Sequence, residues 1–94
     1  MAQLAVRVGH RLLAICSNVL NVIDSDDALN ETLEVLACAQ NVAITVYEGD
    51  KSGIGRATKD DCWQRNERLA TYLPKVQRYF PNAHIRHGMI TTVI

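Results

Sequence analysis

Apolar residues recur every three or four positions through the first 22 residues, and this spacing predicts a helix over residues 2–22. Gly9 lies within this segment and costs a helix about 1 kcal/mol relative to alanine. Positions 4 to 8 also alternate between larger apolar residues and Ala5 or Arg7, so a short strand over residues 4–8 is the competing interpretation. The predicted helical stripe consists of Leu4, Val8, Leu12, Ile15, Val19 and Val22.

The stretch DSDD at residues 24–27 predicts the start of a second helix, which runs to about Ala39. Short side chains that accept hydrogen bonds satisfy the first N–H groups of a helix, and negative charge suits its positive end. The apolar spacing after this start is that of a helix with one buried side. Its predicted buried stripe consists of Ala28, Leu29, Thr32, Leu33, Leu36 and Ala37.

Residues 41–48 are rich in β-branched side chains and alternate in the manner of a strand. A loop with three glycines follows, and Thr58 is the predicted N-cap of a third helix. Apolar spacing continues from Cys62 to Phe80, with a break or kink expected at Pro74, which would open a short second helical piece. Residues 83–94 are the last predicted strand, with an irregularity at Gly88.

These elements predict one α+β domain over residues 1–94, with helices packed on one face of a small sheet. Their order is helix, helix, strand, helix, strand, with a possible extra strand at the N-terminus. Two strands make a poor sheet by themselves, and open sheet edges invite pairing with another chain. We therefore expect the sheet to be completed by dimerisation, with the chain forming a homodimer.

Composition places the 94-residue chain among ordinary packed proteins, since 48% of its residues are hydrophobic and 21% are charged. Wholesale disorder requires lower hydrophobicity and a larger net charge. No run of about 18 uncharged apolar residues occurs, so we expect no transmembrane helix and no membrane partner. The three cysteines are widely spaced, which favours thiols in a reducing compartment and a cytoplasmic location.

The formal net charge is zero, but the two halves of the sequence differ strongly. Residues 1–50 carry a net charge of −5, and residues 51–94 carry +5. The simplest explanation is that the two halves neutralise each other in the fold. The alternative is a basic face that meets an acidic partner, a second subunit or nucleic acid.

The glycine-rich loop between the predicted strand and the third helix is a candidate anion or ligand site. Backbone N–H groups and a helix dipole at such a position favour bound anions. Neither the P-loop nor the dinucleotide-binding spacing is present, and a flexible connection is the simpler interpretation. The candidate residues of this site are Gly53, Gly55, Arg56 and Lys59.

The predicted third helix carries basic and aromatic residues opposite its apolar spacing. Such a face can follow phosphates and stack on bases, or it can contact a protein partner. A simply solvated helix face is the alternative, and no known nucleic-acid-binding motif supports the first interpretation. The candidate residues are Arg65, Arg68, Tyr72, Lys75, Arg78 and Tyr79.

Catalytic chemistry finds little support in the sequence. Cys62 lies near a predicted helix start and could be an activated thiol, with His84 or His87 as its base. Its place in the apolar spacing favours a buried structural thiol instead. Cys16 and Cys38 are likewise predicted to be buried in the core. Two histidines three apart on a strand point to opposite faces, so we expect no metal and no cofactor.

The leading function predicted from the sequence is therefore a small non-catalytic protein-interaction or regulatory module. The first alternative is a nucleic-acid-associated protein that uses the basic and aromatic helix face. The second is a small-ligand binder or enzyme that uses the glycine-rich loop and Cys62.

Overall fold

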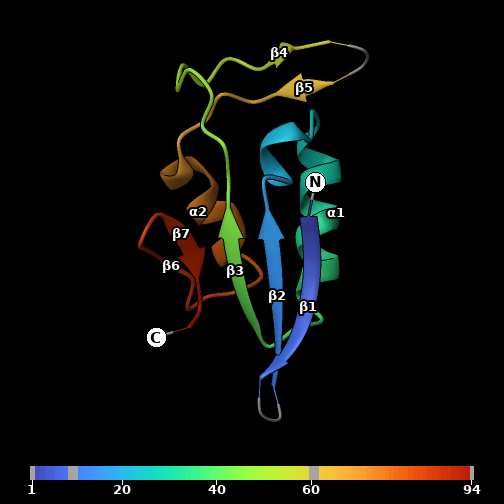
Figure 1. Ribbon diagram of the computed structural model, residues 1–94, viewed down its shortest axis with the longest axis vertical. Coiled ribbons are helices and arrows are strands. Elements are labelled where there is room, and N and C mark those ends of the chain that lie inside the picture. The colour runs from blue at the N-terminus through green and yellow to red at the C-terminus, as the bar shows by residue number, and fades with distance from the viewer. Residues whose placement is uncertain (1, 9–10, 60–61, 94) are drawn as a thin grey trace.

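The protein is a small mixed α and β domain, shown in Figure 1 as a computed structural model that describes residues 2–8, 11–59 and 62–93. Its main sheet has five strands in the spatial order β1-β2-β3-β7-β6. These strands are β1 (Ala2–Val8), β2 (Arg11–Ser17), β3 (Asn41–Thr45), β6 (His84–Arg86) and β7 (Met89–Thr91). β2 and β3 are parallel, and the other neighbouring pairs are antiparallel.

Both helices lie on the same face of this sheet (Figure 1). α1 (Asp26–Leu36) connects the parallel strands β2 and β3, and α2 (Leu69–Gln77) precedes β6. Side chains alternate between the two faces of a strand, so every second strand residue points toward the helices. The core therefore consists of these strand residues and the apolar side of each helix. The fully buried centre includes Cys16, Leu20, Leu29, Leu33, Val42, Ile44, Tyr72, Val76 and Ile90.

The start of α1 agrees with the sequence prediction. Ser25 is the N-cap, and its Oγ accepts a hydrogen bond of 3.0 Å from the N–H of Ala28. Asp26 and Asp27 lie in the first turn, where negative charge is favourable. Among the described residues, no helix is both long and apolar enough to cross a membrane.

The predicted N-terminal helix is wrong. β1 and β2 form an antiparallel pair there, followed by the short 3-10 helix η1 (Leu20–Val22), and the alternative of a strand over residues 4–8 agrees with β1. The apolar spacing predicted a helix because β2 is apolar on both sides. Ala14 and Cys16 are buried under the helices, while Leu13 and Ile15 lie on the other face. Such a run does not alternate and resembles a helix. Gly9 lies outside the described residues.

The predicted third helix from Thr58 is also wrong in its first half. A second, two-stranded sheet of β4 (Arg56–Ala57) and β5 (Trp63–Gln64) occupies this part, and α2 begins only at Leu69. Asn66 has φ of +59°, which no α-helix accommodates. Pro74 is the sixth of the nine residues of α2, and the helix continues through it although proline has no N–H to donate there.

The predicted last strand over residues 83–94 is a hairpin of β6 and β7. His87 and Gly88 form its two-residue turn, with φ of 53° and 75°. Two consecutive positive φ values are the requirement of a type I′ turn, which matches the twist of the strands. The expected irregularity at Gly88 is thus a chain reversal.

Candidate binding surface

Arg65 is a buried cation that ties the β4–β5 hairpin to the start of α1. Its side chain is only 8% exposed. Its Nε donates to the carbonyl of Ile23 over 2.6 Å, and one terminal nitrogen lies 2.7 Å from Asp26 Oδ1. The other terminal nitrogen lies 3.4 Å from Glu67 Oε2. Arg65 is therefore a structural connector and is not available to a phosphate backbone.

Asn66 holds the glycine-rich loop in place. Its Oδ1 accepts from the N–H of Asp50 over 3.3 Å, and its Nδ2 donates to the carbonyl of Ile54 over 3.0 Å. Its own carbonyl accepts from the N–H of Gly53 over 2.8 Å. A Cβ on Gly49 would collide with the Asn66 side-chain oxygen, so the glycine permits this close approach.

Three amides of the glycine-rich loop donate to acceptors within the loop itself. The N–H groups of Lys51, Ser52 and Ile54 donate to Glu48, Asp50 and Ser52 respectively. The next element is β4 and not a helix, so no helix dipole acts on the loop. The amides that an anion would use already have partners within the chain.

The four residues predicted for that site do not converge. Gly53 and Gly55 line a cavity of about 220 Å³ together with three carboxylates, which would repel an anion. Arg56 is exposed and lies 3.8 Å from Asp50, and Lys59 is exposed in the segment between β4 and β5. The cavity is lined by Asp24, Asp26, Gly53, Gly55, Trp63, Arg65 and Glu67.

The six residues predicted for a basic and aromatic face do not form one surface. Arg65 and Tyr72 are buried. Lys75 lies 3.7 Å from Asp26 and is partly covered. Arg68 and Arg78 are exposed, and the Arg78 guanidinium lies 6.0 Å from the centre of the Tyr79 ring. Arg68 and Arg78 are the N-cap and the C-cap of α2 and therefore lie at its opposite ends.

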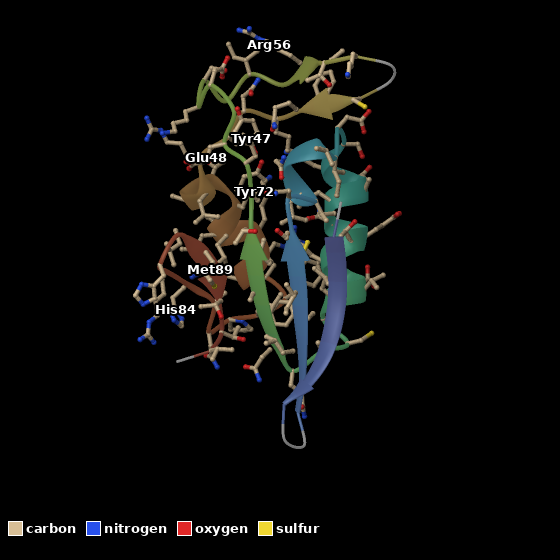
Figure 2. All side chains as sticks on the ribbon, viewed as in Figure 1. Tyr47, Glu48, Arg56, Tyr72, His84 and Met89 are labelled. Atoms are coloured by element: carbon tan, nitrogen blue, oxygen red, sulfur yellow. The ribbon has the colours of Figure 1, made fainter. Side chains whose placement is uncertain are left out.

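Tyr72 of α2 belongs to the buried core and lies close to Glu48, three residues beyond the end of β3 (Figure 2). Glu48 Oε2 accepts from the N–H of Leu69 over 2.7 Å and so caps the start of α2. Burial, with a smaller contribution from the charges of Glu67 and Glu48, raises the pKa of Tyr72 to about 12. Its hydroxyl is buried and has no hydrogen-bond partner among the described residues.

Replacing Tyr72 by phenylalanine is therefore expected to leave the free energy of unfolding unchanged or to raise it by up to about 1 kcal/mol, because a buried hydroxyl without a partner is costly. Denaturant unfolding checks this. Tyr72→Ala is the contrasting variant, and it should destabilise by about 3–5 kcal/mol through the cavity it leaves. A loss above about 1 kcal/mol in Tyr72→Phe would show that the hydroxyl is satisfied.

The three cysteines differ in their burial. Cys16 is buried, as predicted, and burial raises the pKa of its thiol to about 11. Cys38 and Cys62 are exposed, so their predicted burial is wrong, and Cys62 follows the β4–β5 turn without a helix start to activate it. Within the described residues, no group of three or more potential metal ligands occurs.

The face of the sheet opposite the helices is the surface that remains to be explained, and we call it the open face. No described helix covers it, and Figure 1 looks onto it. Along β2 and β3 the helix-facing residues are buried, and the alternate residues are partly exposed. The described side chains of the open face are Leu13, Ile15, Ser17, Asn41, Ala43, Thr45, His84, Arg86, Met89 and Thr91.

The middle of the open face is largely apolar, and His84 and Arg86 lie at its β6 edge. Leu13, Ile15, Ala43 and Met89 contribute carbon surface, and the hydroxyls of Ser17 and Thr45 bond each other over 3.0 Å. The register pairs positions 4 and 6 of the neighbouring strand β1 with Ile15 and Leu13. Sheets with one solvated face normally carry polar residues there.

Tyr47 extends the open face beyond the end of β3 (Figure 2). It follows Ala43 and Thr45 in the alternation, and 62% of it is exposed. At the other side, beside Met89, a hollow of about 270 Å³ is lined by Arg86, His87, Met89, Thr91 and Val93. The sequence signal for this surface is the alternation over residues 4–8, which the helical interpretation of residues 2–22 obscured.

Comparison with protein-family models, with curated proteins and with solved structures finds no match.

Proposed function

We propose that the protein is a small non-catalytic interaction module, acting in the cytoplasm as a homodimer, which binds a protein partner through the open face. The observation that carries this proposal is that the apolar group of Leu13, Ile15, Ala43 and Met89 on the open face has no helix on it among the described elements. Burying such a surface stabilises a complex by roughly 25 cal/mol per Å² of apolar area, before the costs of association.

The chemistry of the open face suits a protein partner better than a nucleic acid. Tyrosine and methionine are enriched at protein interfaces, and charged residues are depleted at their centres. Tyr47 and Met89 lie on this face, and its described basic side chains, His84 and Arg86, lie on the edge strand β6 and not at its centre. Binding through this surface should persist at moderate salt, whereas phosphate contacts weaken steeply.

The test is Ile15→Glu, which places a charge at the centre of the open face. Val35→Glu is the matched control, because Val35 is 65% exposed on α1, away from this face. In affinity capture from the native cell, the wild type and Val35→Glu should retain the same protein partner, and Ile15→Glu should lose it by at least tenfold. Both variants should keep the wild-type circular dichroism spectrum.

A dye that fluoresces on apolar surfaces gives a readout that needs no partner. It should bind the wild-type protein and Val35→Glu equally, and Ile15→Glu more weakly. Equal capture of the partner by Ile15→Glu and Val35→Glu would contradict the assignment of the open face.

A further inference from the structure

The two edges of the main sheet are very unequal. The strand order ends at β1 on one side and at β6 on the other. β6 has three residues, and two of them, His84 and Arg86, are polar. β1 has seven residues, AQLAVRV, with one charge and no proline. A long edge of this kind presents unpaired N–H and C=O groups to any second strand, whereas short and charged edges discourage pairing.

The register shows which backbone groups of β1 point outward. The N–H of Asn18 donates to the carbonyl of Thr45, so the even-numbered residues of β2 direct their backbone groups toward β3. The odd-numbered residues of β2 therefore face β1. They are paired with positions 2, 4, 6 and 8 of β1. Backbone groups alternate in direction along a strand, so positions 3, 5 and 7 point away from the sheet.

We infer that β1 pairs antiparallel with β1 of a second copy, centred on Ala5, to join the two sheets into one. This inference rests on the proposed function, since it names the arrangement of the homodimer. The register centred on Ala5 uses all three outward positions and places Gln3 opposite Arg7 of the partner subunit. A register centred on Arg7 would place two like charges opposite each other and would use one outward position only.

The joined sheet also explains how a small open face becomes a sufficient binding surface. With strands about 4.8 Å apart and about 3.3 Å per residue, the five strands cover about 400 Å². A stable interface takes about 800 Å² from each partner. Two copies joined at β1 supply about this area, with both open faces on the same side. The two-fold arrangement is closed, so pairing stops at the dimer.

The first experiment replaces Ala5 by proline and measures the mass in solution by light scattering. Proline at an outward position removes an edge N–H without removing a bond to β2. The wild type should be a dimer at micromolar concentration, and Ala5→Pro should be a folded monomer, with at least a tenfold weaker dimer. A dimer of wild-type strength in Ala5→Pro would overturn the inference.

The second experiment tests the register by crosslinking in a background carrying Cys38→Ser and Cys62→Ser. Residues directly opposite in a hydrogen-bonded pair have Cα atoms about 5.5 Å apart, which a disulfide can bridge. Ala5→Cys should therefore oxidise readily to a linked dimer. Gln3→Cys is the matched control, because position 3 lies about 13 Å from its copy in this register. Equal crosslinking of the two would overturn the inference.

Failure of this inference is distinguishable from failure of the proposed function. A wild-type protein that remains monomeric at high concentration would overturn β1 pairing, while the Ile15→Glu and Val35→Glu comparison would still report on the open face. Conversely, a β1-linked dimer whose partner binds Ile15→Glu normally would retain the pairing and reject the open face as the binding surface.

Discussion

Replacing Arg65 by alanine is expected to lower the free energy of unfolding by about 2–4 kcal/mol, because the change removes the hydrogen bonds and ion pairs of a buried cation at once. The carbonyl of Ile23 loses its donor, and the mostly buried carboxylate of Glu67 loses its counter-charge. Asp26 is 66% exposed and is rehydrated, which limits the loss. Denaturant unfolding of the purified variant measures the effect.

The control is Arg68→Ala, which removes the same charge three residues later from an exposed position. It should change the free energy of unfolding by less than about 0.5 kcal/mol. Arg65→Ala and Arg68→Ala of equal stability would contradict the role assigned to Arg65.

Arg65→Ala should also change the pKa of Asp26. The hydrogen bond from Arg65, and then the charges of Lys75 and Arg65, lower the pKa of Asp26 below 3.8. A carboxyl group whose pKa is lower in the folded state stabilises the fold at pH values above its unfolded-state pKa. This stabilisation disappears as the pH falls through the folded-state pKa. In Arg65→Ala the pKa of Asp26 should move up toward 3.8, which an NMR titration of its carboxyl carbon detects.

The elements that were predictable from the sequence are those whose signals are local. The DSDD start of α1 and the alternation of β3 depend on neighbouring residues and match the structure in type and approximate position. β2 was not predictable in this way, because a strand with apolar residues on both sides loses its period. The β4–β5 hairpin was missed because Cys62 and Asn66 continued a helical spacing that the backbone of Asn66 interrupts.

The candidate site residues were misplaced for a related reason. Arg65 and Tyr72 have the side chains of a nucleic-acid-binding surface, but burial depends on which segments lie across from them, and that is a property of the tertiary fold. The open face likewise depends on both helices packing on the same side of the sheet. A period of two indicates that a strand has two different faces, and it does not indicate which one remains uncovered.

Replacing Asn66 by alanine is expected to destabilise the protein by about 2–4 kcal/mol. Two side-chain hydrogen bonds to the glycine-rich loop are lost, each worth about 1 kcal/mol. The backbone at φ of +59° adds a cost of about 1 kcal/mol for alanine, because asparagine tolerates this region better.

Asn66→Gly separates these two contributions, since glycine adopts positive φ without strain. It should lose the same hydrogen bonds and be less destabilised than Asn66→Ala by about 1 kcal/mol. In both variants, hydrogen exchange at the amide of Asp50 should accelerate, because its acceptor Asn66 Oδ1 is gone. Equal stability of the two variants would show that the backbone conformation carries no cost, and unchanged exchange at Asp50 would show that Asn66 does not hold the loop.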